Sequence, residues 1–222
     1  KVAYGFLPNV NLSLFRSPWD REAARAELGW PRDKLIFLLA SRVDYTWKSA
    51  DVFLDAFARF AADRDGARLV VTGWGNDYRD ARERIERQGL LPKVIFLEAC
   101  FAKPALFRRY AAADVIVDQF KVGLLGSVSF EALCMGKPVL TYLAPFNLHG
   151  YPSPPPILNA RTQGDILRQL EFCAAEPAAL ARIGSESSRW YSTVYAARNL
   201  SSCVKTLAES GPGAWVATTD FR

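Results

Sequence analysis

The stretch VIVDQFKVGLLGSVSFEALCMGKPVL, residues 115–140, contains two apolar runs separated by a loop and a short helical pattern. The runs at 115–118 and 139–142 are typical of strands that are buried on both faces. The loop between them is rich in glycine and serine and leads into a helix predicted over 128–135. Two buried strands joined through a helix are the repeating unit of a parallel sheet.

The same alternation continues on both sides of this stretch. Further strands are predicted at 35–40, 68–72, 94–97 and 157–159, and further helices at 20–28, 49–62, 77–88, 104–113, 166–175, 178–190 and 196–209. We therefore predict an α/β fold, a Rossmann-like doubly wound parallel sheet of about six strands with C-terminal helices. Residues 1–18 are expected to form a linker, 19–210 the domain and 211–222 a loose tail, with a long loop at 145–156.

Composition favours a globular chain and does not choose between an anionic ligand and a membrane surface. Half of the 222 residues are hydrophobic, and the net charge of +5 fits either an anion or a membrane surface. No apolar run is long enough to span a membrane, and the basic residues form no tract, so no nucleic-acid partner is predicted. Four widely spaced cysteines indicate reduced thiols and a cytoplasmic location, with peripheral association at the cytosolic face of a membrane left open.

No metal site is predicted, because the chain has one histidine, His149, and no C-x-x-C pair. The D-x-D at 63–65 is expected to be a solvated loop on the opposite edge of the sheet from the other candidate residues. The only methionine, Met135, lies inside the chain, which begins at Lys1. We therefore expect a fragment whose upstream domain is missing.

The candidate binding residues follow predicted strands at their carboxyl ends, where ligands bind in open α/β sheets. Arg42 follows the first strand, Gly73 and Gly75 end the second, Cys100 follows the third, and residues 123–131 follow the fourth. All of them are therefore expected at one edge of the sheet.

The predicted helix start after the fourth strand suits a phosphate, since it offers free backbone N–H groups and the positive end of the helix dipole. Its residues are Gly126, Ser127, Val128 and Ser129. Arg42 and Lys48 are predicted to converge on a diphosphate there, and Glu131 to accept hydrogen bonds from ribose hydroxyls. The alternatives left open are solvated cations, a glutamate that complements the helix dipole, and a tight turn at residues 73–75.

These residues resemble the C-terminal, donor-binding domain of GT-B glycosyltransferases of family 4 (group 1). Arg42 with 48–57 resembles the family's Arg…Lys-Gly-x-x-x-hydrophobic-x-x-Ala-Phe pattern, and 70–75 its strand and Gly-x-Gly turn. Residues 110–115 resemble its Tyr-x-x-Ala-Asp-Val, and 131–139 its Glu-Ala-Met-Ala-x-Gly-Lys-Pro-Val. The similarity extends over about residues 8–205.

The resemblance implies one half of a retaining, metal-independent hexosyltransferase that needs no cofactor. Its donor would be a UDP or GDP sugar, and its acceptor a glycan, lipid or small molecule held by a missing N-terminal domain. By the same resemblance, Arg42 and Lys48 bind the donor diphosphate, Glu131 holds the ribose, and backbone near Cys100 faces the base. Backbone near Ser127 and Val128 would meet phosphate or sugar, and the isolated chain is expected to transfer little or no sugar.

Three positions depart from the family pattern. Gly123 stands where the first of two glutamates is common, Ser49 follows Lys48 where glycine is common, and Glu98 stands where a strand-end glycine is common. The loss of a glutamate at Gly123 favours a non-catalytic nucleotide-sugar-binding module as the alternative. A sugar-nucleotide epimerase and a Rossmann oxidoreductase are weaker alternatives. The first usually needs catalytic carboxylates and a His that this fragment does not supply, and the chain lacks the full G-x-G-x-x-G of the second.

Overall fold

The computed structural model describes residues 20–148, 151 and 153–194. Its strands form one all-parallel sheet of six, in the order β3-β2-β1-β4-β5-β6. They are β1 (Leu35–Leu39), β2 (Ala67–Gly73), β3 (Val94–Glu98), β4 (Val115–Val117), β5 (Val139–Thr141) and β6 (Leu158–Asn159). The predicted six-stranded parallel sheet is confirmed.

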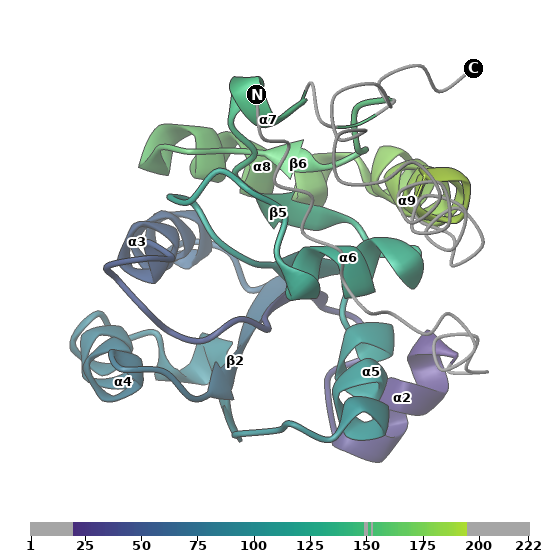
Figure 1. Cartoon of the computed structure of the whole chain (residues 1–222). Helices are drawn as coiled ribbons and strands as arrows, with labels where there is room; N and C mark the ends of the chain where they lie inside the picture. Colours follow the sequence, from purple (N-terminus) through teal and green to yellow (C-terminus); the bar gives the residue numbers. More distant parts are fainter. Residues whose placement is uncertain (1–19, 149–150, 152, 195–222) are drawn as a thin grey trace.

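Helices cover both faces of the sheet (Figure 1). They are α2 (Arg21–Leu28), α3 (Ala50–Ala61), α4 (Tyr78–Arg87), the 3-10 helix η1 (Leu91–Lys93), α5 (Lys103–Ala112), α6 (Ser127–Cys134), α7 (Pro145–Leu148), α8 (Gln163–Ala175) and α9 (Pro177–Val194). Helices α3, α4, α8 and the start of α9 share one hydrophobic core, and α2, α5, α6 and the end of α9 share the other. The architecture is therefore three-layered and doubly wound.

The central strand β1 shows why its sequence is apolar throughout. Phe37 and Leu39 belong to the core under α3, whereas Ile36 and Leu38 belong to the core under α5 and α6. Successive side chains of a strand point to opposite faces, so a strand covered by helices on both sides needs apolar residues at every position. Each of these four side chains is fully buried.

The predicted loop at 145–156 differs from the structure, which has the short helix α7 at its start. The Asn147 amide donates to the Gly123 carbonyl at 2.6 Å, and its backbone N–H donates to Ala144 O at 2.9 Å. This helix is held by a contact with the loop after β4, which local sequence preferences do not reveal. The helix predicted at 196–209, the linker at 1–18 and the tail at 211–222 lie outside the described residues.

Among residues 20–148, 151 and 153–194, no helix has both the length and the hydropathy needed to cross a membrane. In the same part of the chain, no group of three or more His, Cys, Asp and Glu side chains is arranged to hold a metal ion.

Candidate functional site

The loops that carry the predicted site residues all leave the sheet at its carboxyl edge. Because the strands are parallel, the loops after β1, β2, β3 and β4 emerge side by side in the order β3-β2-β1-β4. Arg42 and Lys48 lie after β1, Gly75 after β2, Cys100 after β3, and residues 126–131 after β4. The structure therefore brings these residues to one edge, as the sequence predicts.

Lys48 lies against the start of α6. Its ammonium donates to Asp118 Oδ1 at 2.9 Å, and its carbonyl accepts from Phe120 N at 2.9 Å. A Cβ placed on Gly126, the residue before α6, would lie 3.8 Å from Lys48 Nζ. Within residues 20–148, 151 and 153–194, no side chain caps this helix at Gly126, which leaves the amides of its first turn for a ligand. A cation and an uncapped helix start thus adjoin one another.

Asp118 is a site residue that sequence reasoning missed. Its side chain is fully buried, and it accepts from Lys48 through one oxygen and from Ser129 Oγ, at 2.7 Å, through the other. A buried carboxylate needs a charged or hydrogen-bonding partner, so Asp118 fixes both Lys48 and the first turn of α6. The available signal was an acidic residue directly after the apolar strand β4.

Arg42 makes its ion pair within its own loop. Its guanidinium lies 3.1 Å from Asp44 Oδ2, and its side chain is 41% exposed. Asp44 is buried and also accepts from Trp47 N at 2.6 Å, so it shapes the loop that carries Lys48. Because the Asp44 carboxylate is buried, a ligand that draws Arg42 away has to compete with this ion pair. The convergence of Arg42 with Lys48 on one diphosphate stays a prediction.

Glu131 lies in the second turn of α6 and points toward α5. Its carboxylate accepts from Tyr110 Oη at 3.2 Å and is paired with the Lys103 ammonium. Burial and the charge of Glu131 raise the pKa of Tyr110 well above its ordinary value, so the phenol stays a donor. Glu131 is itself almost fully buried, whereas Lys103 is half exposed. A ribose hydroxyl that approaches Glu131 therefore competes with Lys103, a partner that sequence reasoning missed.

Gly73, which ends β2, and Gly75, which follows it, allow close contact between main chains. A Cβ on Gly73 would lie 2.0 Å from Leu97 O, and one on Gly75, whose φ is +118°, would lie 2.2 Å from Val43 O. Val43 N also donates to Trp74 O at 2.9 Å, which ties this turn to the loop of Lys48. Packing accounts for both glycines, and contact with a ligand stays a prediction for them.

Cys100 and Gly123 are two predicted positions at the carboxyl edge whose side chains are not placed to contact a ligand. The Cys100 side chain is partly buried against the core under α5, so its backbone is the part that could face a ligand. Gly123 has a φ of +74°, and a Cβ there would lie 2.8 Å from the Ala144 Cβ. A glutamate does not fit at Gly123 without movement of the chain, so this departure from the family pattern is part of the local fold.

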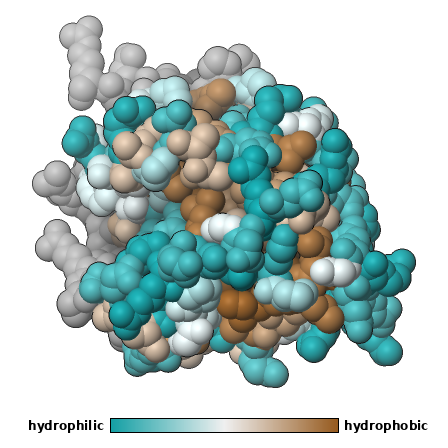
Figure 2. Space-filling model, turned by 180° about the vertical axis from the view of Figure 1, so that it is seen from behind, coloured by the Kyte–Doolittle hydropathy of each residue, from teal (hydrophilic) through white to brown (hydrophobic). Residues whose placement is uncertain are grey.

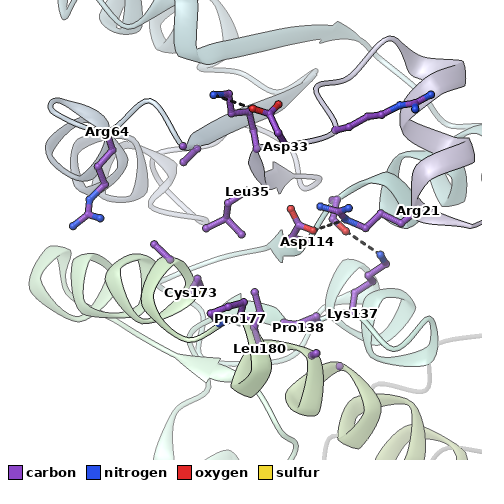
Figure 3. A pocket seen from close by; sticks show the side chains of 18 of the residues that line it. Arg21, Asp33, Leu35, Arg64, Asp114, Lys137, Pro138, Cys173, Pro177 and Leu180 are labelled. Atoms are coloured by element: carbon purple, nitrogen blue, oxygen red, sulfur yellow. Dashed lines mark hydrogen bonds and ion pairs between the residues drawn. The ribbon is translucent and has the colours of Figure 1, made fainter.

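A cavity of about 660 Å³ lies at the other, amino edge of the sheet (Figure 3). Arg21, Asp114 and Lys137 lie on one side of it, and its apolar lining includes Leu35, Cys173, Pro177 and Leu180. Arg21 pairs with Asp114 at 2.8 Å, and Lys137 donates to the carbonyls of Ala111 and Ala113 at 2.7 and 2.9 Å. These charged side chains are already paired with groups of the protein, so the cavity is a poorer candidate for a ligand site than the carboxyl edge.

The surface seen from behind Figure 1 is largely hydrophilic, with separate hydrophobic patches between the charged side chains (Figure 2). On this face the apolar surface is thus broken up rather than continuous.

Comparison with known proteins gives consistent results. The sequence profile of the family described as glycosyl transferases group 1 matches residues 20–149. A D-inositol 3-phosphate glycosyltransferase of Mycolicibacterium paratuberculosis is 35% identical over 137 residues, which are 60% of this chain and 30% of that protein. One of Streptomyces bingchenggensis is 31% identical over 193 residues, 80% of this chain and 41% of that protein. The chain spans less than half of the length of these relatives.

Solved structures share the fold at low sequence identity. The C-terminal domain of a glycosyl transferase group 1 family protein (LpcC) from Francisella tularensis has a TM-score of 0.68 and 16% identity, over 83% of this chain and 97% of that chain. Anabaena Alr3699/HepE, solved in complex with UDP and glucose, has a TM-score of 0.72 and 20% identity, over 89% of this chain and 55% of that chain. The fold is the Rossmann-like half of a GT-B glycosyltransferase, and the chain belongs to the family of glycosyl transferases group 1.

Proposed function

We propose that this chain is the donor-binding part of a glycosyltransferase that uses a nucleotide-diphosphate sugar. The observation that carries the proposal is the Lys48 ammonium, held by Asp118 beside the uncapped start of α6. The diphosphate of the donor lies at this helix start, and Arg42 joins it from the same loop. The solved neighbour in complex with UDP and glucose supports a uridine nucleotide, and GDP is the second candidate.

The proposed chemistry is electrostatic. When the bond between sugar and diphosphate breaks, negative charge develops on the leaving diphosphate. A fixed ammonium and aligned amides stabilise that charge more than they stabilise the ground state, and this lowers the barrier. Each charge-assisted hydrogen bond contributes about 1.5–3 kcal/mol, and the helix end about 0.3–1 kcal/mol. We propose retention of configuration and transfer without a metal ion.

The acceptor is proposed to bind to another part of the protein, since the relatives named above are more than twice as long as the segment they share with this chain. A glycan, a lipid or a small molecule remains open as the acceptor, and a cytoplasmic location stays a prediction. Gly123 supplies no side chain to the donor sugar. The relatives nevertheless carry glycosyltransferase names, which does not favour a non-catalytic module.

Calorimetry on the chain with UDP, GDP, ADP and inorganic pyrophosphate tests this function. We expect at least one nucleoside diphosphate to bind, and Lys48→Met to weaken it about 10- to 100-fold, the equivalent of ~1.5–3 kcal/mol. Lys34→Met is the control, because Lys34 is as exposed as Lys48 and is also paired with aspartates, but lies at the amino edge. Its partners are exposed whereas Asp118 is buried, so melting temperatures must first show that both variants are folded at the temperature of the titration. Binding that is absent, or that is equally sensitive to both substitutions, contradicts the proposal.

A further inference from the structure

The loop between β4 and α6 is arranged around the side chain of one residue, Gln119. Its amide nitrogen donates to Leu124 O at 2.9 Å and to Tyr142 O at 2.6 Å. Its side-chain oxygen accepts from Lys121 N at 2.9 Å and from Val122 N at 2.8 Å. All four partners are main-chain groups, and Gln119 is almost fully buried. The carboxamide therefore uses both of its donors and both of its acceptor sites on the backbone.

The orientation of this carboxamide follows from its partners. Two carbonyl oxygens face its nitrogen, and two N–H groups face its oxygen. If the group were turned over, donors would face donors and acceptors would face acceptors, which is costly for buried polar groups. Neither a carboxylate nor an apolar chain at Gln119 satisfies the same four groups.

The loop that Gln119 holds leads directly into the proposed diphosphate site. Leu124 lies two residues before Gly126, the residue from which α6 starts. Leu125, between them, is buried in the core under α5 and α6. Because this short connection is anchored at both ends, a shift of Leu124 is passed on to the amides of residues 127–129.

The two residues next to Gln119 hold Lys48. Asp118 accepts from the Lys48 ammonium at 2.9 Å, and Phe120 N donates to the Lys48 carbonyl at 2.9 Å. Asp118 also accepts from Ser129 Oγ, in the first turn of α6, at 2.7 Å. Three consecutive residues therefore set the position of the cation relative to the helix amides, and Gln119 acts through the loop that joins the two.

We propose that Gln119 is a positioning residue for the diphosphate site. Its carboxamide fixes the loop at 121–124 so that Lys48 and the amides of residues 127–129 reach the same phosphate. The inference rests on the proposed function, because it takes the donor diphosphate at the start of α6 as given. Donors that are already in place lose no binding free energy to ordering of the loop. Gln119 thus acts on the affinity for diphosphate, whichever base the nucleotide carries.

Gln119→Glu tests this role, because it replaces the two donors with an acceptor and hardly changes the shape of the side chain. At pH 9 a carboxylate would face the carbonyls of Leu124 and Tyr142. The affinity for UDP, GDP and inorganic pyrophosphate should then fall about 10- to 100-fold. At pH 5.5 the protonated carboxyl can donate to one of these carbonyls, so part of the affinity should return.

Calorimetry at both pH values measures the ratio of the affinities of Gln119→Glu and the native chain. The ionisation of the ligands, and of residues around Gln119 such as Asp118, Lys48 and Tyr142, is common to both proteins and cancels in this ratio. Gln119→Met removes all four hydrogen bonds of the side chain. Its affinity should fall as well, and the ratio should not recover at pH 5.5.

Asn159→Asp is the matched control, because it makes the same chemical change in another carboxamide that binds main chain. Asn159 accepts from Leu143 N at 2.9 Å and donates to Leu143 O at 3.0 Å. It lies in β6, two places from β4 in the sheet, so the affinity for all three ligands should stay unchanged. Melting temperatures identify the conditions in which each variant is folded. For a variant too unstable to titrate, the rise in melting temperature caused by pyrophosphate is the second measurement.

The outcomes separate the positioning role from the proposed function. Native affinity in both Gln119 variants, an equal loss in Asn159→Asp, or a loss in Gln119→Glu that is the same at both pH values overturns the positioning role. If binding depends on Lys48 but not on Gln119, the proposed function stands and only the positioning role fails. If the native chain binds neither pyrophosphate nor any nucleotide, the proposed function fails and the positioning role with it.

Discussion

The two edges of the sheet both carry lysines and arginines, yet they use them differently. At the amino edge, Arg25 is fully buried and donates to Asp114 and to four backbone carbonyls, and Lys137 donates to the last carbonyls of α5. At the carboxyl edge, Lys48 is fixed by Asp118 beside a helix start that no side chain of the described part of the protein caps. The volume of a cavity and the number of cations around it therefore do not identify a ligand site. Our proposed ligand site rests instead on an anchored cation beside the start of a helix.

The largest expected effect belongs to the amino edge. Arg25→Met should lower the free energy of unfolding by about 3–5 kcal/mol, because Asp114 and the carbonyls lose their buried partner. Arg21→Met is the control, since Arg21 pairs with the same carboxylate but is 39% exposed, and should cost less than about 1 kcal/mol. Urea unfolding measures both. Equal losses of unfolding free energy in the two variants would show that Arg25 does not stabilise this edge more than Arg21 does.

The second prediction concerns the pair that anchors the carboxyl edge. Lys48→Met should lower the free energy of unfolding by about 2–3 kcal/mol, because Asp118 is fully buried and loses its counter-charge. The double variant Lys48→Met/Asp118→Asn should be more stable than the single one, since no buried charge remains unpaired. The comparison uses urea unfolding at constant pH. Additive losses in the double variant would mean that the two side chains are not coupled.

The third prediction separates the two causes of strain at Gly123. Gly123→Ala should cost about 1–3 kcal/mol, because it combines a left-handed φ with a contact to Ala144. Gly29 has a φ of +67°, but no atom of the described residues lies within 4 Å of a Cβ placed there, so Gly29→Ala should cost only about 1 kcal/mol. Equal losses would show that crowding does not exclude a side chain from this loop.

The fourth prediction is a pH effect confined to the amino edge. Burial lowers the pKa of Lys137 to about 8, against an ordinary value of 10.5. Between these values the unfolded chain binds a proton that the folded chain has released, so stability should rise with pH, by at most about 1.4 kcal/mol per pH unit. The thiols of Cys134 and Cys173, whose pKa burial raises to about 12, act in the opposite sense above their ordinary pKa.

The difference between the native chain and Lys137→Met isolates this effect from the thiols. Urea unfolding at pH 7.5, 8.5 and 9.5 measures the free energy of unfolding of both proteins. The value for the native chain should increase relative to that for Lys137→Met as the pH rises. A difference that is constant over this range would mean that the Lys137 ammonium stays protonated in the folded chain.

The fold could be predicted from the sequence because the features that indicate it involve residues close together in the chain. Each buried strand is a continuous apolar run in the sequence. The helix starts and the glycine turns mark the boundaries between strands and helices. These features placed Lys48, Glu131 and residues 126–129 at one edge without knowledge of the tertiary structure.

The partners of these residues could not be predicted in the same way. Lys48 and Asp118 are 70 positions apart, and Lys103 and Glu131 are 28 apart, so their contacts exist only once the sheet has formed. Helix α7 was missed for the same reason, because Asn147 is held by Gly123 across the loop after β4. Which carboxylate balances which cation is a property of the packed structure, not of the local sequence.

The most direct measurement is a crystal structure of the chain with bound UDP or GDP. The account predicts the diphosphate within hydrogen-bond distance of Lys48 Nζ and of the first amides of α6. Nucleotide bound in the amino-edge cavity beside Lys137, with the α6 start empty, would contradict it.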